Sequence, residues 1–342
     1  MPAFTPESRI RLGHHGPDGV ASLGLGCMGM SLVYGAADEA ESIATLYAAL
    51  DAGVNLIDTG DFYGSGHNEA LLGRALTGRR DEVLLSVKFG ALRAPDGGWG
   101  GVDGRPAAVR NFLAYSLQRL KTDHIDIYRL ARLDPQVPIE DTVGAMAELV
   151  QAGYVRYIGL SEVSADTVER AHRVHPVTDL QIEYSLLSRG PEASIFPRLQ
   201  ALGVGVTAYG VLSRGLLSGS RPAAAGDYRA HLPRFTGANW EANQRLVQRI
   251  AEVATGLGAS TTEVAISWAM TKMHRLGLDA VTVVGSRTRA QLGAALAASK
   301  LQLSDEALAR LEAAVPPEAV AGTRYAEAAM AHLDSERRAA AP

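Results

Sequence analysis

The stretch Ile57-Asp58-Thr59-Gly60-Asp61-Phe62-Tyr63-Gly64 decides the fold and the chemistry that this sequence predicts. A short apolar run ends at Asp58, and Tyr63 follows five residues later, so both side chains are expected at one rim of a sheet. A second apolar run, Leu84–Lys88, ends in an amine twenty-five residues after Tyr63. An acid, a phenol and an amine at the ends of strand-like runs are the groups needed to pass a proton to a carbonyl oxygen.

The three side chains together supply the groups of a proton relay. A phenol has an ordinary pKa of about 10, and a nearby ammonium lowers that value, so we expect Lys88 to lower the pKa of Tyr63. A carboxylate at Asp58 would keep Lys88 charged and in position. Each residue alone also has an ordinary interpretation, as a turn cap, a packed loop residue or a solvated strand end. Their combination favours the catalytic interpretation.

Eight short apolar runs are interpreted as strands that alternate with segments of helical period. The runs are Leu23–Gly26, Leu56–Asp58, Leu84–Lys88, Ile125–Arg129, Val155–Leu160, Leu180–Glu183, Gly205–Ala208 and Ala280–Val283. Helices are expected over Asp38–Leu50 and Val109–Leu120, and Ser164 and Ser304 resemble helix N-caps. The count of eight predicts a closed parallel (β/α)8 barrel with its chemistry at the carboxyl ends of the strands. A doubly wound open sheet is the alternative, but no G-x-G-x-x-G fingerprint supports it.

Segments outside this repeat are expected to cover the two ends of the barrel. Ile10–Gly13 and Val20–Ser22 flank a turn and predict a hairpin that closes the amino-terminal end. The Gly-rich loop from Ala94 to Arg105 and the segment from Gly219 to Trp240 are the two long connections, and such loops usually shape a substrate pocket. A disordered insertion is the alternative around Ala223–Gly226.

Composition fits a single enzyme domain of 342 residues, of which 47% are hydrophobic and 20% charged. The net charge of −4 gives no electrostatic reason to expect nucleic acid or an anionic membrane as a partner. One cysteine, Cys27, excludes an internal disulfide and a cysteine metal cluster. Histidines 14, 15, 172 and 175 have no acidic or cysteine partners at metal-ligand spacing, whereas His67 is close enough to Tyr63 to line a pocket. No apolar run approaches a membrane span and no secretory leader is evident, so a cytoplasmic location is expected.

Ordered motifs along most of the chain resemble those of the aldo-keto reductase superfamily. They are Gly24–Met30, Asp58-Thr59 with Tyr63-Gly64 and Asn68-Glu69, Lys88, Ile125–Tyr128, Gly159–Ser161, Gln181–Ser185, Tyr209–Leu216 and Val284–Arg287. The resemblance implies one domain over residues 1–342 with a core at about 22–303, an N-terminal β-hairpin and extra C-terminal helices. It further implies NADPH as cofactor, no required metal and a small-molecule carbonyl substrate. Asp58, Tyr63 and Lys88 match three positions of the family's catalytic tetrad.

The fourth tetrad position departs from the family pattern. The family usually has His-Arg a few residues after Asp-x-Tyr, whereas this chain has Ala131-Arg132 after Asp126-Ile127-Tyr128. An alanine cannot donate a hydrogen bond to a carbonyl oxygen, and losing one such donor typically costs about 2.7–4 kcal/mol. The expected result is a slow general reductase, a reductase whose substrate or a bound water supplies the missing contact, or a cofactor-binding regulator. The smaller side chain could also leave room for a bulkier substrate.

By the same resemblance, cofactor contacts carry over to residues at the ends of several strands. Ser161 and Gln181 match residues that hold the nicotinamide carboxamide, Glu162 replaces a frequent Asn, and Tyr209 matches the residue that stacks on nicotinamide. Arg214 and the loop amides match the pyrophosphate site, whereas Ser286 and Arg287 match the 2′-phosphate site. The complete expected set is Gly26, Cys27, Met28, Asp58, Ser161, Gln181, Tyr209, Gly210, Leu212, Ser213, Arg214, Leu216, Gly285, Ser286, Arg287 and Gln291.

Three functions are consistent with these residues. The first is NADPH-dependent reduction of an aldehyde or ketone to an alcohol, with Tyr63 as proton donor. The second is a nicotinamide-dependent sugar dehydrogenase or reductase. The third is a non-enzymatic NADPH-binding redox sensor that reports bound cofactor to a partner.

Overall fold

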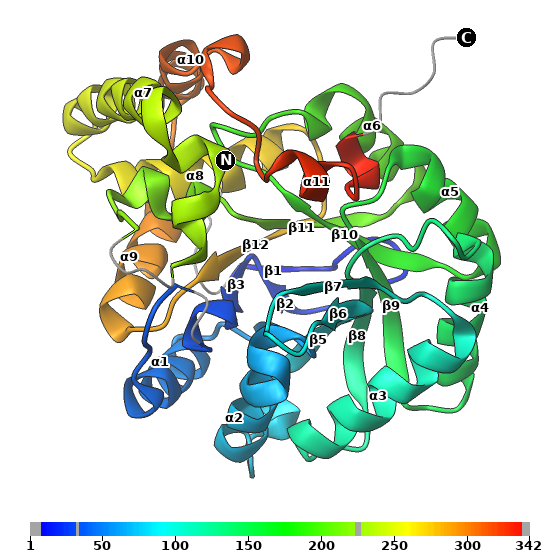
Figure 1. Cartoon of the computed structure of the whole chain (residues 1–342). Helices are drawn as coiled ribbons and strands as arrows, with labels where there is room; N and C mark the ends of the chain where they lie inside the picture. Colours follow the sequence, from blue (N-terminus) through cyan, green and yellow to red (C-terminus); the bar gives the residue numbers. More distant parts are fainter. Residues whose placement is uncertain (1–7, 32–33, 223–226, 337–342) are drawn as a thin grey trace, which may run out of the picture.

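The structure is a computed structural model that describes residues 8–31, 34–222 and 227–336. Eight parallel strands form a closed barrel surrounded by helices, which confirms the predicted (β/α)8 fold (Figure 1). In order around the barrel they are β3 (Leu23–Gly26), β4 (Leu56–Gly60), β5 (Leu84–Phe89), β8 (Ile125–Leu130), β9 (Val155–Ser161), β10 (Val177–Glu183), β11 (Gly205–Tyr209) and β12 (Ala280–Gly285).

Strand register brings the predicted chemistry to one rim of the barrel. Gly26 pairs with Asp58 across β3 and β4, and Gly60 pairs with Lys88 across β4 and β5. Phe89 pairs with Leu130 across β5 and β8. Because the strands are parallel, their carboxyl ends and the loops that follow them meet on the same side.

Helices on the outside cover the apolar faces of the strands. They are α1 (Glu39–Asp51), α2 (His67–Ala75), α3 (Pro106–Leu120), α4 (Ile139–Gln151), α5 (Ala165–Val174), α6 (Pro191–Leu202), α7 (Gly237–Gly256), α8 (Thr261–Arg275), α9 (Arg289–Lys300), α10 (Asp305–Ala314) and α11 (Glu327–Met330). Ser164 and Ser304 cap α5 and α10 as predicted, each accepting a hydrogen bond from a backbone amide three residues on. Helix α10 packs against α7 beside the barrel (Figure 1).

A hairpin of β1 (Arg9–Ile10) and β2 (Val20–Ala21) closes the amino-terminal end of the barrel, as expected. Leu12 and Val20 form a buried cluster with Leu56, Ile127 and other residues inside the barrel. The amide of His14 also donates to the carbonyl of Gly203 at 2.7 Å. This end is therefore filled with apolar side chains, and the opposite end is where polar side chains gather.

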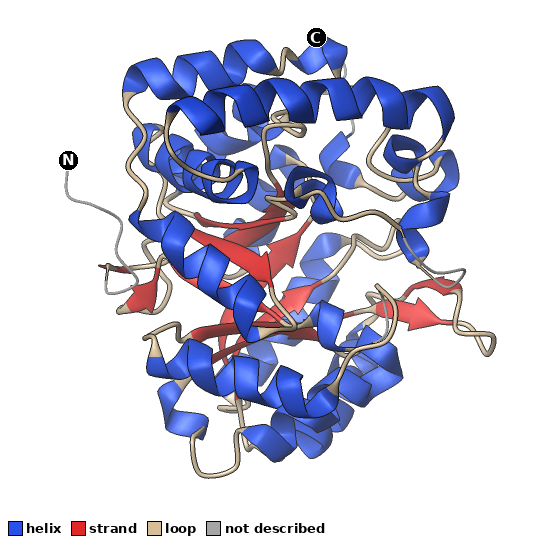
Figure 2. Ribbon diagram, turned by 90° about the vertical axis from the view of Figure 1, so that its left-hand side faces the viewer, coloured by secondary structure: helices blue, strands red, loops and turns tan. Residues whose placement is uncertain are grey.

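The Gly-rich loop after β5 is ordered as a second hairpin, β6 (Ala91–Arg93) and β7 (Trp99–Val102), which the sequence did not predict. Figure 2 shows the two hairpins at opposite ends of the barrel. Residues 223–226, where a disordered insertion was considered, lie outside the described residues. In the described ranges no helix has the length and apolar character needed to span a membrane.

Candidate active site

The centre of the site is a buried ion pair between two neighbouring strands. Lys88 Nζ lies 2.5 Å from Asp58 Oδ2, and both side chains are 6% exposed. Ser86 Oγ and Gln181 Nε2 each donate to Asp58 Oδ1 at 2.9 Å. Burial lowers the pKa of Lys88, whereas the Asp58 carboxylate raises it. The structure thus brings together two of the three predicted catalytic residues, with Asp58 fixing the position of the amine.

Tyr63 lies directly above this pair, at the start of the short helix η2 (Tyr63–Gly66). Its ring centroid is 5.1 Å from Lys88 Nζ, and the ring is almost completely buried. Burial raises the pKa of Tyr63 well above its usual value, Asp58 raises it further, and Arg132 lowers it. The expected lowering of this pKa by Lys88 is therefore wrong, because burial and the charge of Asp58 outweigh Arg132, the cation that lowers it.

Asn68 at the start of α2 holds the turn after β3 against β4. Its Nδ2 donates to the carbonyl of Cys27 at 2.8 Å, and Thr59 Oγ1 donates to its Oδ1 at 2.6 Å. The amide of Cys27 in turn donates to the carbonyl of Asp58 at 2.9 Å. Gly26 and Met28 flank this anchored position, so the backbone of all three predicted cofactor residues borders the catalytic pair.

The turn after Tyr63 depends on a close approach between a glycine and an arginine. Gly66 has φ +93, and a Cβ at this position would lie 2.8 Å from Arg119 Cδ. Arg119 Nε lies 2.5 Å from Glu69 Oε2, which is fully buried. Burial raises the pKa of the neighbouring Asp61 to about 8, and Glu69 raises it further. Two neighbouring acids, Asp61 and Glu69, therefore lie next to the loop that carries Tyr63.

Ala131 follows β8 and is almost completely buried. Its amide donates to the carbonyl of Phe89 at 2.9 Å, so this position is held directly against the end of β5. The residue that would carry the missing histidine is therefore next to the strand that carries Lys88. The polar side chain at this point of the loop belongs to Arg132.

Arg129 is an internal cation that sequence reasoning missed. It is fully buried, and its guanidinium contacts Ser86, Asp179 and Asp58, the last at 3.4 Å. Thr207 also donates to Asp179, which extends the polar layer across the barrel. The available signal was an arginine inside the apolar run Ile125–Arg129. This layer places a second cation beneath Asp58.

The predicted nicotinamide end combines Gln181 and Tyr209 with a strained acidic residue. Glu162 has φ +53, a left-handed conformation that is uncommon for a residue other than glycine. Its Oε1 accepts from the Tyr209 hydroxyl at 2.8 Å and from the amide of Glu183 at 3.0 Å. Ser161 precedes it at the buried end of β9. Glu162, which stands where the family frequently has Asn, is thus hydrogen-bonded to Tyr209, the tyrosine predicted to stack on nicotinamide.

A C-terminal segment, residues 320–336, which we call the strap, crosses this end of the barrel (Figure 1). Arg324 on the strap donates to Glu162 at 2.8 and 3.0 Å and to Glu183 at 3.2 Å. Ser335 Oγ donates to Glu162 Oε2 at 2.6 Å. The hydroxyl of Tyr325 lies 3.2 Å from that of Tyr209. Sequence reasoning missed these residues because no local pattern connects them to β9 or β10.

The predicted pyrophosphate loop follows β11 and contains strained backbone. Ser213 and Arg214 both have positive φ values, of +46 and +56. Arg214 Nη2 donates to Glu183 Oε2 at 2.9 Å, and its guanidinium lies 4.3 Å from the Tyr325 ring centroid. The side chain that was expected to hold pyrophosphate is therefore occupied by contacts to Glu183 and the strap. Gly210, Leu212 and Leu216, which were also predicted to contact the cofactor, lie in the same loop.

The predicted 2′-phosphate end lies between β12 and α9. Ser286 is buried, and its Oγ has no hydrogen-bond partner among the described residues. Arg287 is half-buried and donates to the carbonyls of Tyr34 and Ala36 at 3.1 and 3.2 Å, while its amide donates to Gln291 Oε1 at 2.9 Å. An unsatisfied buried hydroxyl beside a guanidinium and the start of a helix fits a phosphate.

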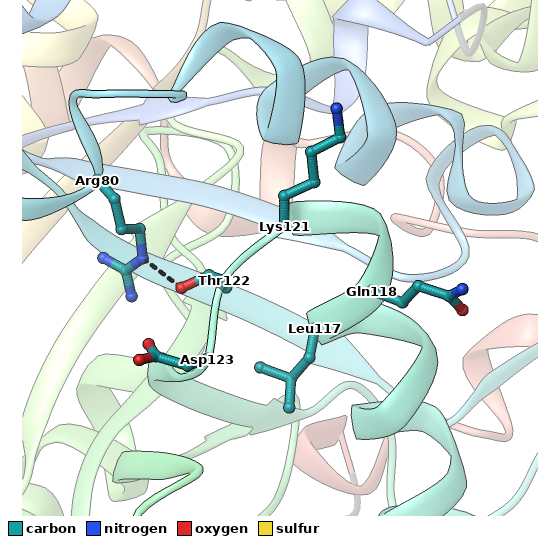
Figure 3. Close-up of a pocket in the computed structure, with 6 residues that line it drawn as sticks. All are labelled: Arg80, Leu117, Gln118, Lys121, Thr122 and Asp123. Carbon is teal, nitrogen blue, oxygen red and sulfur yellow. Dashed lines mark hydrogen bonds between the residues drawn. The ribbon is translucent and has the colours of Figure 1, made fainter.

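One surface cavity of about 600 Å³ lies elsewhere (Figure 3). It is lined by Arg80, Leu117, Gln118, Lys121, Thr122 and Asp123. Arg80 also contacts Asp126 at 2.7 Å, at the amino-terminal end of β8. The cavity is therefore at the barrel end opposite Lys88, and it contains none of the predicted site residues.

Comparison with known proteins identifies the class that the fold and site define. The family model for the aldo/keto reductase family matches residues 22–316, and the chain belongs to this family.

Three solved structures are similar to this chain over most of its length. A glycerol dehydrogenase from Gluconobacter oxydans, AKR11B4, is 26% identical with a TM-score of 0.80, and the match covers 91% of this chain and 97% of that one. The holo form of the aldo-keto reductase AKR11C1 from Bacillus halodurans is 28% identical with a TM-score of 0.75, at the same coverages. The thermostable aldo-keto reductase Tm1743 is 25% identical with a TM-score of 0.71, covering 90% and 99%.

Proposed function

We propose that the protein reduces an aldehyde or ketone to an alcohol, with Tyr63 passing a proton to the carbonyl oxygen. The observation that carries this proposal is the stack of Tyr63 on the buried Asp58–Lys88 pair, at the carboxyl end of a barrel. Membership of the aldo/keto reductase family supports oxidoreduction of carbonyl or alcohol groups.

The residues have separate roles in this proposal. The raised pKa keeps the Tyr63 phenol protonated at neutral pH, which is the state needed for donation. Lys88 stabilises the charge left on the phenol oxygen, and Asp58 holds Lys88 in place. The nicotinamide dinucleotide would supply hydride when bound against Tyr209.

NADPH, and not NADH, is the cofactor that we propose. Ser286 and Arg287 at the start of α9 offer a hydroxyl, a guanidinium and helix-terminal amides to a 2′-phosphate. A reductase without the tetrad histidine would be slower by roughly 10²- to 10³-fold if nothing replaced that donor. The similarity to a glycerol dehydrogenase supports a second candidate function, in which a polyol or sugar is oxidised or reduced at the same site. Because Ala131 cannot donate a hydrogen bond to a carbonyl oxygen, a non-enzymatic redox sensor is the third candidate.

The test is to replace the proposed donor and its partner. We expect Tyr63→Phe and Lys88→Met to abolish NADPH consumption across a panel of aldehydes and ketones. Tyr63→Phe should bind NADPH with nearly unchanged affinity, measured by quenching of protein fluorescence. Tyr154→Phe is a matched control, since that ring is 49% exposed and lies at the other end of the barrel. Retention of substantial activity in Tyr63→Phe would show that another group donates the proton, and an inactive wild type that binds NADPH would favour the sensor.

A further inference from the structure

Arg132, the residue after Ala131, places a guanidinium beside the proposed site. Its side chain is half-buried, and Nη1 donates to the carbonyl of Ala131 at 2.6 Å. Its Nη2 approaches the hydroxyl of Tyr325 at 3.4 Å, and that hydroxyl is 3.2 Å from the hydroxyl of Tyr209. The cation therefore lies between Ala131 and the predicted nicotinamide end.

Arg132 has an unusual lack of acidic partners. Of the arginines that are buried or half-buried in residues 8–31, 34–222 and 227–336, only Arg132 and Arg287 have no carboxylate within 4.0 Å. Arg287 is at the end proposed to bind phosphate. The negative charge of Glu162 raises the pKa of Arg132, but the carboxylate oxygens of Glu162 accept hydrogen bonds from Arg324, Ser335 and other groups.

An anionic ligand would compensate the positive charge of Arg132, whereas a neutral ligand would not. A cation removed from water is costly unless an opposite charge compensates it, and a neutral carbonyl compound supplies no such charge. The planar guanidinium matches the two oxygens of a carboxylate in a bidentate contact. Arg132 is also the cation that lowers the pKa of Tyr63, which agrees with a position near the proposed proton donor.

We propose that Arg132 binds a carboxylate of the substrate, so that the natural substrates are oxo acids, with an aldehyde or ketone in the same molecule as the carboxylate. This inference rests on the proposed carbonyl reduction, and the carboxylate is unchanged while the carbonyl becomes an alcohol. Arg132 then selects and orients the substrate from the position next to the missing histidine.

The experiment compares acids with neutral analogues of the same length. The probes are ω-oxo acids of two to six carbons and the methyl ester of each, assayed with NADPH for kcat/KM. We expect the wild type to prefer at least one acid over its ester by about tenfold or more, the range for a charged hydrogen bond. Arg132→Gln should lose this preference, and Arg132→Lys should keep part of it. Arg170→Gln, at an exposed ion pair on α5, is the matched control that keeps it.

Binding without cofactor separates this inference from the proposed function, because no reduction can then occur. Calorimetric titration should show that the preferred acid binds about tenfold more weakly to Arg132→Gln than to the wild type, with its ester unaffected. If the wild type reduces nothing but shows this difference, the proposed function fails and the carboxylate site stands. If aldehydes are reduced with no preference for any acid, or if Arg132→Gln binds the acids normally, the inference is overturned. A preference for a phosphorylated aldehyde over every oxo acid also overturns the assignment of a carboxylate.

Discussion

Replacing Arg324 by methionine should release the strap from the barrel, because this guanidinium joins three acids. It contacts Glu162 and Glu183 on the barrel and Glu336 further along the strap. Methionine keeps much of the apolar stem and removes the charge. Of the two barrel acids, Glu183 retains Arg214 and Arg234, whereas Glu162 is left with no described cation within 4.0 Å.

The expected loss of stability follows from the burial of this pair. The side chain of Glu162 is 0% exposed and that of Arg324 is 7% exposed. Removing one partner of a buried ion pair typically costs about 3–5 kcal/mol, because the remaining charge is left without compensation. An exposed pair such as Arg170–Glu140, with side chains 49% and 40% exposed, should cost no more than about 1 kcal/mol when Arg170 is replaced by methionine.

The pH dependence of the free energy of unfolding provides a second, independent test of this prediction. Burial alone would raise the pKa of Glu162, but Arg324 lowers it below the usual range, so the wild type keeps this stabilisation at neutral pH and loses it only in acid. In Arg324→Met burial would dominate and raise the pKa of Glu162. The stability deficit of the variant should therefore shrink as the pH falls from about 8 to about 5.

The measurement is urea unfolding of the wild type, Arg324→Met and Arg170→Met at both pH values, together with limited proteolysis to locate the released segment. Cleavage within the strap at urea concentrations too low to unfold the barrel would show that the contacts of the strap open before the barrel unfolds. Equal losses for the buried and the exposed pair, or a deficit that does not depend on pH, would refute the assignment of Arg324 as the main neutralising partner of Glu162.

Three further changes test other parts of the site. Arg287→Ala should weaken NADPH binding by about 1.5–3 kcal/mol and leave NADH nearly unaffected, and an equal loss for both cofactors would contradict the 2′-phosphate assignment. Ala131→His should increase kcat/KM for small aldehydes; if the alanine makes room for a bulky substrate, the same variant should reject that substrate by overpacking, at about 1–3 kcal/mol. Burial raises the pKa of Asp61 to about 8, so the wild type should lose stability as the pH rises from the ordinary range of a carboxyl group towards that value. Asp61→Asn should therefore have a higher Tm than the wild type at pH 9 and nearly the same Tm at about pH 4, and parallel pH profiles would show that Asp61 does not titrate in this range.

Local periodicity was enough to predict the barrel. Each predicted strand is present, and the structure extends several of them, as with Leu180–Glu183, which belongs to β10 (Val177–Glu183). The hairpin of β6 (Ala91–Arg93) and β7 (Trp99–Val102) was not predicted, because the glycines of β7 and of the loop between the strands hide the alternation typical of strands. Side chains close to one another in sequence, such as Asp58 and Tyr63, were placed at the correct rim.

The parts of the site that depend on distant contacts could not be predicted. Arg324 contacts Glu162, which is 162 positions away along the chain, and no pattern in either segment indicates the other. The direction of the Tyr63 pKa shift was also inaccessible, since it depends on how completely the ring is buried. Arg132 was visible in the sequence, but its lack of an acidic partner could be recognised only once the positions of the surrounding carboxylates were known.

The strap has a consequence for the order in which the protein is made. Ribosomes synthesise the chain from its amino terminus, so all eight barrel strands emerge before Arg324 does. Until then Glu162 and Glu183 have no contact with Arg324, and the Tyr209 hydroxyl has no contact with Tyr325. A nascent barrel can therefore form its Asp58–Lys88 pair early, whereas the surface expected to receive nicotinamide is completed only after the strap has been synthesised.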